Sequence, residues 1–259
     1  MDLGISGRKA IVCASSEGLG KGCAMALAEA GCEVIVNART KATVDATVTE
    51  IANATDAKVV GVAADVGTKE GQAALLEACP SPDILINNNG GPPRRNYGDL
   101  ERQDMIEGVV QNMITPIELI QAVAPGMAER GFGRIVNITS LSVLMPIEGL
   151  DLSSGARAGL TAFLAGVRPI YAGSNVTMNN LLPGKMDTKR LRGGLEAGAK
   201  ASGRTFEEVA QAQMDEIPAK RFGTADEFGN PCAFLCSTHA GYITGQNILM
   251  DGGLFPHAF

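Results

Sequence analysis

Short runs of apolar and β-branched residues recur along the chain, separated by longer stretches with helical patterning. The short runs are nearly continuously apolar, which is typical of strands that are buried on both faces of a parallel sheet. The stretches between them, such as 20–30 and 101–130, are long enough to form helical crossovers. The pattern predicts an α/β fold: a single doubly wound (Rossmann) parallel sheet of about seven strands with helices on both faces. The expected strands are at residues 10–13, 34–37, 59–62, 84–87, 135–138, 176–179 and 248–250.

The composition indicates one folded domain that spans residues 1–259. Hydrophobic residues make up 45% of the chain and charged residues 19%, a balance that excludes a disordered chain. No linker, internal repeat or low-complexity tract divides the sequence. The formal net charge of −6 argues against a nucleic-acid partner, since proteins that bind nucleic acid usually carry a basic surplus.

The sequence shows no signal for a membrane partner or a bound metal. No run of about 20 apolar residues is present, and the N-terminus lacks the basic-then-apolar order of a signal peptide. The six cysteines have no zinc spacing, so we expect them to be buried free thiols. Free thiols are typical of a reducing compartment, and we therefore expect a cytoplasmic protein.

A glycine-containing turn follows the first expected strand. It reads Ala14-Ser15-Ser16-Glu17-Gly18-Leu19-Gly20 and leads into a helix. Glycine at 18 and 20 allows a tight turn and lets the backbone approach a pyrophosphate closely. Because the free N–H groups at the start of a helix point toward such an anion, the turn predicts a phosphate site.

The spacing of this turn resembles the Thr-Gly-x-x-x-Gly-x-Gly fingerprint of the short-chain dehydrogenase/reductase family. Further similarities follow in order along the whole chain: the segment 87–90 resembles the family's Asn-Asn-Ala-Gly signature, and the segment 244–246 resembles its last strand. The chain is most similar to members like the 3-oxoacyl-carrier-protein reductases. The resemblance implies a nicotinamide cofactor held by Ala14, Ser16, Gly18, Leu19, Gly20, Arg39, Asp65, Val66, Asn89, Gly90, Arg157, Pro183, Gly184 and Thr188.

Two residues give opposite indications about the cofactor. Arg39 follows the second expected strand, where family members that use NAD carry an acid; an arginine suits the 2′-phosphate of NADP. Glu17 lies in the turn where phosphate-binding relatives carry a basic residue, and an acid there repels a phosphate by about 1 kcal/mol or more. On balance the sequence favours NADP(H) over NAD(H).

The resemblance implies where the catalytic positions lie, but two of these positions carry residues with different chemistry in this chain. Ser140 matches the catalytic serine of the family, and Asn112 matches its helix asparagine. Ser153 occupies the position of the catalytic tyrosine and Arg157 that of the lysine four residues later. A serine hydroxyl is a far weaker acid than a phenol, and losing a positioned general acid typically costs about 10²–10⁴ in rate. The usual proton route therefore does not carry over.

Other residues offer substitutes for that proton route. Pro116 has no N–H, so the carbonyl of Asn112 loses its helical partner and can hold a water. An ordinary proline kink explains the same residues. Tyr97, in the loop after the fourth strand, and Asp151, two residues before Ser153, are candidate acids; surface or packing roles are the alternative for both.

Basic residues gather where the family has its substrate lid. Six lie between 185 and 204, and Arg94 and Arg95 lie in the loop after the fourth strand. Segment 185–218 is the expected lid, and its glycines predict that it is mobile. Two basic loops at one sheet edge would suit an anionic substrate, whereas a solvated lid helix explains the same charges.

Three functions remain open from the sequence. The first is an NAD(P)(H)-dependent oxidoreductase acting on a carbonyl or hydroxyl small molecule by a non-standard proton route. The second is a catalytically impaired cofactor-binding subunit that pairs with an active sister chain. The third is a non-redox enzyme similar to halohydrin dehalogenases, which share the arginine but keep the tyrosine and lack the glycine turn. Phe255 and Phe259 in the tail would expose two aromatic rings on a monomer. Since members of the family form dimers and tetramers, the resemblance implies a homodimer or homotetramer.

Overall fold

The computed structural model describes residues 1–92 and 94–256 and contains one parallel sheet of seven strands. The strands lie in the order β3-β2-β1-β4-β5-β6-β7. This arrangement confirms the doubly wound fold predicted from the sequence. The strands are β1 (Lys9–Val12), β2 (Glu33–Ala38), β3 (Val59–Ala63), β4 (Ile84–Asn87), β5 (Gly133–Ile138), β6 (Val176–Pro183) and β7 (Asn247–Met250).

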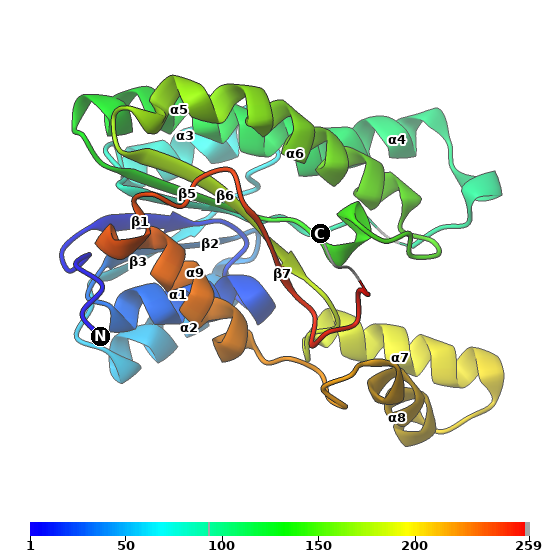
Figure 1. Ribbon diagram of the computed structural model, residues 1–259. Coiled ribbons are helices and arrows are strands. Elements are labelled where there is room, and N and C mark those ends of the chain that lie inside the picture. Colours follow the sequence, from blue (N-terminus) through cyan, green and yellow to red (C-terminus); the bar gives the residue numbers. More distant parts are fainter. Residues whose placement is uncertain (93, 257–259) are drawn as a thin grey trace.

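Helices cover both faces of the sheet (Figure 1). One face carries α1 (Gly18–Glu29), α2 (Lys41–Ala54) and α9 (Ala225–Cys236), and the other carries α3 (Lys69–Ala78), α5 (Thr115–Glu129) and α6 (Asp151–Ala172). Helix α4 (Arg102–Val109) extends beyond the sheet on the second side. Helices α7 (Lys189–Ser202) and α8 (Phe206–Glu216) stand apart, past the carboxyl ends of the strands (Figure 1).

Each strand sends alternate side chains into two separate apolar cores. Val12, Ile86 and Val136 belong to the core beneath α1 and α9, whereas Ile11 and Leu85 belong to the core beneath α5 and α6. All five side chains are at most 1% exposed. Because both faces are covered, the strands have the nearly continuous apolar pattern seen in the sequence.

A ladder of four asparagines crosses the sheet, at the carboxyl ends of β4 and β5, within β6 and at the start of β7. Asn87, Asn137, Asn180 and Asn247 are register partners on β4, β5, β6 and β7. Each Nδ2 donates to the Oδ1 of the next residue, at 2.9, 3.0 and 2.8 Å along the series. The ladder satisfies buried amides inside the sheet and fixes the strand ends that carry the site.

The stretch 101–130 is helical as expected, but it is not an ordinary proline-kinked helix. A π-helical turn, η2 (Val110–Ile114), separates α4 from α5, and Pro116 lies in the first turn of α5. Proline lacks the N–H that would bond four residues back, so the backbone takes the wider π turn instead of only bending. Asn112 lies inside this turn and is buried.

Both predicted features of the cysteines, burial and the absence of disulfides, are confirmed, because all six are free and buried. Burial raises the pKa of the Cys13 and Cys32 thiols to about 12, so both are protonated at pH 8. We therefore expect the native protein to react slowly with a thiol reagent at pH 8 and to release all six thiols once guanidinium unfolds it. Rapid labelling of one thiol in the native protein would contradict this prediction.

Candidate functional site

The turn between β1 and α1 contains two residues with left-handed backbone conformation and one glycine that no other residue could replace. Ala14 and Gly18 have φ values of 45° and 58°. A Cβ at Gly20 would lie 2.3 Å from the carbonyl oxygen of Ala14, so only glycine fits there. Glu17 occupies the N-cap of α1 without a side-chain cap, which leaves the first N–H groups of the helix available to an anion. Leu19 packs against the core.

The start of α7 lies over this turn. A Cβ at Gly18 would be 3.5 Å from Cγ2 of Thr188, and Thr188 caps α7 by accepting from the backbone N–H of Leu191. Lys189 lies 3.7 Å from the Glu17 carboxylate. The negative charge of Glu17, which argued against a phosphate, is therefore matched by a lysine from the lid segment.

The carboxyl ends of β2 and β3 carry the expected adenine-side residues. Arg39 is exposed and forms no ion pair in the described part of the chain. Asp65 is exposed, and its carboxylate accepts from the backbone N–H of Gly67 at 2.9 Å. Val66 is buried and lines the cavity described next. These positions leave Arg39 accessible to a ligand phosphate.

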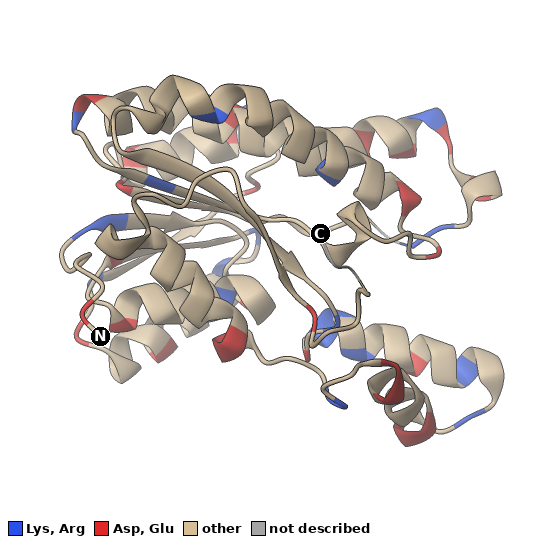
Figure 2. Cartoon of the chain, viewed as in Figure 1, with Lys and Arg blue, Asp and Glu red and all other residues tan. Residues whose placement is uncertain are grey.

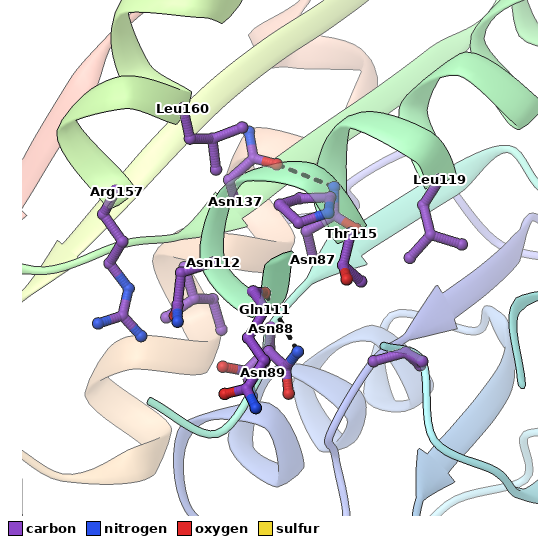
Figure 3. Close-up of a pocket in the computed structure, with 13 residues that line it drawn as sticks. Asn87, Asn88, Asn89, Gln111, Asn112, Thr115, Leu119, Asn137, Arg157 and Leu160 are labelled. Atoms are coloured by element: carbon purple, nitrogen blue, oxygen red, sulfur yellow. Dashed lines mark hydrogen bonds between the residues drawn. The ribbon is translucent and has the colours of Figure 1, made fainter. Parts of the chain in front are cut away.

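A cavity lies where β4, β5, η2 and α6 meet (Figure 3). Its polar wall consists mainly of amides, and two buried oxygens on that wall, Asn87 Oδ1 and Thr115 Oγ1, have no hydrogen-bond partner. The polar residues on its wall are Asn87, Asn88, Asn89, Gln111, Asn112, Thr115, Asn137 and Arg157. Such orphaned oxygens fit a bound donor group or an ordered water.

The two asparagines that were expected in the site have defined partners. Asn89 donates from Nδ2 to the carbonyl oxygen of Gln111 at 3.1 Å, and Asn112 donates to that of Gly108 at 3.2 Å. The structure thus ties the strand-end asparagine to the π turn. Gly90 follows at an exposed position with open space around it. The sequence had named Asn89 and Asn112 separately; the structure brings both to one cavity.

Ser153 and Arg157 lie one turn apart on α6. Ser153 is 1% exposed, and Arg157 donates from Nη1 to Ser153 Oγ. Figure 3 shows the Arg157 side chain descending from α6 beside Asn112. Burial, reinforced by the positive charge of Arg190, lowers the pKa of Arg157 to about 10. Arg157 therefore brings a desolvated guanidinium to the cavity wall, with the Ser153 hydroxyl one hydrogen bond behind it.

Ser140 lies just past the end of β5. Its hydroxyl accepts from the backbone N–H of Ser142 at 3.1 Å and caps the short 3₁₀ helix η3 (Leu141–Val143), which contacts α6. Ile138, two residues earlier, lines the cavity. Ser140 is thus held at the same strand edge as the cavity, with its hydroxyl hydrogen free to donate.

The last expected cofactor residues follow β6. Pro183 ends that strand, and the backbone N–H of Gly184 donates to the Met250 carbonyl at 2.9 Å. A Cβ at Gly184 would lie 2.6 Å from Cβ of Asp251, so the glycine allows this close approach to the last strand. From here the chain enters the lid segment 185–218, which folds as α7 and α8. Its mobility stays a prediction.

Tyr97 and Asp151 lie outside the cavity. Tyr97 belongs to the 3₁₀ helix η1 (Tyr97–Asp99) and is 83% exposed, and Asp151 is an exposed residue at the start of α6. Neither lines the cavity. The structure therefore gives no support to either residue as a substitute acid.

Sequence reasoning missed three cavity residues: Gln111, Thr115 and Asn137. Asn137 carried a usable signal, because a polar residue inside the apolar run 135–138 must find a buried partner. Gln111 and Thr115 flank Asn112 on the π turn and the start of α5. A straight helix would have directed them elsewhere, so nothing in the sequence marked them.

A parallel sheet of this order, a glycine turn at α1 and a cavity at the carboxyl ends of the strands define a Rossmann domain of the dinucleotide-binding kind. Residues 13–255 match the protein family described as Enoyl-(Acyl carrier protein) reductase. The chain therefore belongs to the short-chain dehydrogenase/reductase family.

Characterised relatives match over nearly the whole chain. The 3-oxoacyl-[acyl-carrier-protein] reductase FabG of Aquifex aeolicus (strain VF5) is 30% identical over 259 residues, covering 98% of this chain and 100% of that one. The NADPH-dependent reductase BacG of Bacillus subtilis (strain 168) is 30% identical, covering 96% and 98%. The crystal structure of L-sorbose reductase from Gluconobacter frateurii, complexed with NADPH and L-sorbose, has a TM-score of 0.95 and 27% identity, covering 100% of both chains.

The described residues contain neither a membrane-spanning helix nor a cluster of metal ligands. No helix among residues 1–92 and 94–256 is both long and apolar enough to cross a membrane. The same residues contain no group of three histidine, cysteine or acidic side chains that could hold a metal ion.

Proposed function

We propose that this protein is an NADP(H)-dependent oxidoreductase that acts on the carbonyl or hydroxyl group of a small molecule. The observation that carries the proposal is the contact between the glycine turn at Gly18 and Gly20 and a cavity lined by Arg157, made through Asn88, whose Nδ2 donates to the carbonyl oxygen of Ala14. The relatives named above are reductases, and the L-sorbose reductase structure contains NADPH.

The residues present fit a nicotinamide dinucleotide. The glycine turn and the open start of α1 suit a pyrophosphate, and Arg39 suits a 2′-phosphate. Asp65, Val66, Asn89 and Gly90 follow β3 and β4 at the same sheet edge, where ligands of such folds bind. Pro183, Gly184 and Thr188 border that edge from the side of β6 and α7. When bound, NADPH supplies the hydride that reduces the carbonyl carbon.

The protein's own groups act on the carbonyl oxygen. We assign the hydroxyls of Ser140 and Ser153 to donate hydrogen bonds to this oxygen. As negative charge develops there, the guanidinium of Arg157, one hydrogen bond behind Ser153, stabilises it. The proton that completes the alcohol comes from water held near Asn112, because neither serine is a strong enough acid to release one unaided.

This assignment gives Ser153 and Arg157 the positions that a tyrosine and a lysine hold in the family. A phenol donates its own proton, whereas the serine–arginine pair provides a charge-assisted hydrogen bond. Slow turnover of simple ketones follows from that difference. The sister-subunit and dehalogenase-like alternatives gain no observation from the structure.

The cofactor preference gives the direct test of the proposal. In a fluorescence titration we expect NADPH to bind the purified protein more tightly than NADH. The Arg39→Asp variant should weaken NADPH binding about 10- to 100-fold and leave NADH binding nearly unchanged, because the 2′-phosphate loses a charged partner. Lys41→Gln is the matched control, since Lys41 is engaged by Asp45 at 2.6 Å.

Two results of this titration would contradict the proposal. Failure of both cofactors to bind below about 1 mM would remove hydride transfer, since the cofactor concentration needed for useful occupancy would be too high. Equal affinities for NADPH and NADH, with no change in Arg39→Asp, would remove the assigned role of Arg39.

The exposed apolar side chains suit self-association as a homodimer or homotetramer. Met105 and Ile106 on α4 are 45% and 44% exposed, and Phe163 and Ile170 on α6 are 42% and 69% exposed. Helices α4 and α6 contact each other, so these side chains lie on neighbouring elements. Phe259, which also suggested an interface, is outside the described residues; a sister chain is the alternative occupant of these surfaces.

A further inference from the structure

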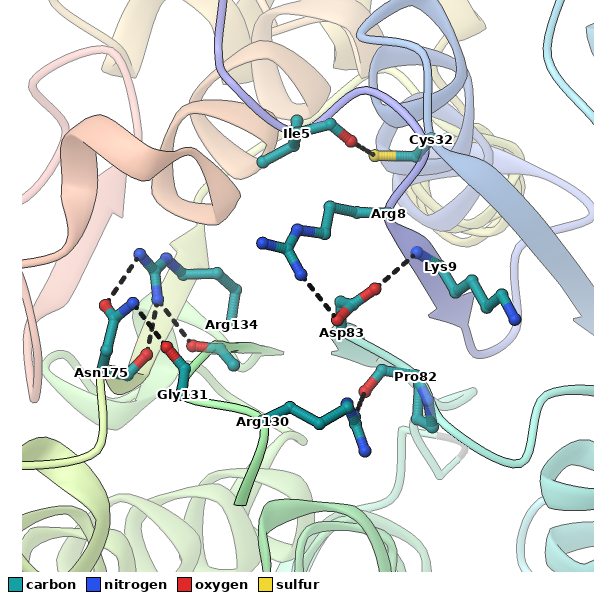
Figure 4. A network of polar contacts seen from close by, with 11 residues as sticks. Ile5, Arg8, Lys9, Cys32, Pro82, Asp83, Arg130, Gly131, Arg134 and Asn175 are labelled. Atoms are coloured by element: carbon teal, nitrogen blue, oxygen red, sulfur yellow. Dashed lines mark hydrogen bonds and ion pairs between the residues drawn. The ribbon is translucent and has the colours of Figure 1, made fainter. Parts of the chain in front are cut away.

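A buried arginine, Arg134, and a half-buried one, Arg157, have contrasting surroundings. Arg134, on β5, is 1% exposed, and its guanidinium donates to the backbone oxygens of Ser237 and Gly133. It also donates to the backbone oxygen and the Oδ1 of Asn175 (Figure 4). The guanidinium also lies 4.3 Å from the ring centre of Phe132. The fold itself uses most of the donors of Arg134, so this residue serves the structure.

Arg157 instead has most of its donors unused. Its one hydrogen-bond partner among the described residues is Ser153, and no carboxylate there forms an ion pair with it. The other residues of the cavity wall are neutral. A guanidinium has five N–H donors, and a desolvated charge without a counter-charge is costly. The fold therefore retains at this cavity a cation that its own residues do not neutralise.

Arg190 is a second arginine without an acidic partner among the described residues, and its charge acts on Arg157. Its Nη1 and Nη2 donate to the backbone oxygens of Gly91 and Pro92, both at 3.1 Å, which joins α7 to the loop after β4. The charge of Arg190 acts on Arg157, and the charge of Arg94 acts on Arg190. No carboxylate pairs with Arg94 or Arg190 in the described ranges. Arg190 thus lies close enough to both Arg157 and Arg94 for their positive charges to repel.

Four acids of the surrounding elements are engaged by other cations. Figure 2 shows basic residues gathered at the start of α7, but several of these are already neutralised. The pairs are Asp187 with Arg192 at 2.7 Å, Glu17 with Lys189 at 3.7 Å, Glu216 with Lys185 at 2.6 Å and Asp104 with Arg95 at 2.9 Å. No acid among residues 1–92 and 94–256 pairs with Arg157 or Arg190, so both guanidiniums are available to an anionic ligand.

We propose that the substrate carries a carboxylate next to its reacting carbonyl and that Arg157 and Arg190 bind this carboxylate. The planar guanidinium matches a carboxylate through two parallel hydrogen bonds. Because Arg157 is bonded to Ser153, which the proposed function places at the carbonyl oxygen, the carboxylate lies one or two carbons away, as in a 2-oxo or 3-oxo acid. The inference rests on the proposed function and names its substrate class.

Matched pairs of acid and ester give the test. Pyruvate and acetoacetate, each beside its methyl ester, are titrated into the NADPH complex by calorimetry and assayed for NADPH oxidation. We expect each acid to bind about 10- to 100-fold more tightly than its ester, because the ester lacks the charge. Added salt should weaken binding of the acid and leave the ester unaffected.

Two arginines on the same helix provide the variant and its control. Arg190→Gln should reduce the acid-to-ester ratio about 10-fold or more, because one charged hydrogen-bond partner is lost. Arg192→Gln removes an equal charge two residues away, but Arg192 is already paired with Asp187, so the ratio should stay unchanged. A ratio that falls equally in both variants would indicate general attraction by the basic surface and overturn the inference.

The remaining outcomes separate this inference from the proposed function. If the esters bind or react as well as the acids, the carboxylate site is wrong and the oxidoreductase stands. If Arg190→Gln weakens NADPH binding and leaves the ratio unchanged, these arginines serve a cofactor phosphate and the carboxylate site is wrong. Binding of the acids without turnover still supports the site. Failure of NADPH itself to bind would overturn the proposed function together with the inference.

Discussion

Replacing Arg157 with glutamine should lower kcat/KM for carbonyl reduction about 10²- to 10³-fold, the usual cost of losing one group that stabilises the developing oxyanion. Glutamine keeps a donor within reach of Ser153 but removes the positive charge. If the charge is what matters, Arg157→Lys should recover part of the activity, although lysine cannot reproduce the planar fork. Stopped-flow or steady-state NADPH oxidation with the best acid substrate measures the effect.

The pH dependence provides a second measure of the same group. Burial and the charge of Arg190 lower the pKa of Arg157 to about 10. The charged, active form therefore predominates below this value, and kcat/KM should fall as the pH rises through about 10. Arg157→Lys should shift or blunt this fall, whereas Ser153→Ala should lower the plateau and leave the position of the fall unchanged. An identical profile in all three proteins would contradict the role of Arg157.

Stability supplies a readout that does not depend on turnover. The pKa of Arg157 is lower in the folded chain than its ordinary 12.5, so the charged form is disfavoured by folding at every pH below about 10. Between these two values the unfolded chain binds more protons, and stability rises with pH. At neutral pH the residue therefore costs stability, and Arg157→Met should raise the Tm while abolishing activity. A lower Tm would indicate a structural role instead.

The fold was predictable because its signals are redundant along the sequence. Apolar runs such as 84–87 and 135–138 have the length and continuity of buried parallel strands, and a glycine turn marks the start of the first helix. The π turn at Val110–Ile114 was not predictable, because the sequence shows only that Pro116 removes one hydrogen bond. Whether the backbone bends or widens there depends on packing against α6, which no local pattern contains.

The site was predictable in its positions but not in its electrostatics. Asn89, Asn112 and Arg157 were each named from the sequence, and they line one cavity. The partners of the charged residues were not predictable, since ion pairs such as Lys189 with Glu17 join segments far apart in the chain. From the sequence alone, the six basic residues between 185 and 204 could not be told apart by their ion pairs. The structure divides them into cations that are neutralised by acids and the few, Arg190 among them, that are not.

Replacing Gly22 with valine should destabilise the protein by about 3 kcal/mol or more and weaken NADPH binding at the same time. Gly22 lies in α1 at the point where this helix crosses α9. A Cβ there would lie 2.3 Å from the carbonyl oxygen of Ala225, and a Cβ at Gly229 would lie 2.3 Å from that of Gly22. The two backbones touch, so a side chain can be accommodated only by separating the helices.

Separation of α1 from α9 also moves the start of α1, which the proposed function places at the cofactor phosphates. The Tm of Gly22→Val should therefore fall by about 6–12 °C, measured by calorimetry. The Kd for NADPH should rise at temperatures where the variant is still folded. Gly166→Ala is the control, because Gly166 lies on α6 with no atom within 4 Å of an added Cβ. Alanine there should stabilise the helix by about 0.5–1 kcal/mol. A Gly22→Val variant with unchanged Tm and Kd would show that the helices can separate without disturbing the turn, and the close contact would not be what positions the phosphate site.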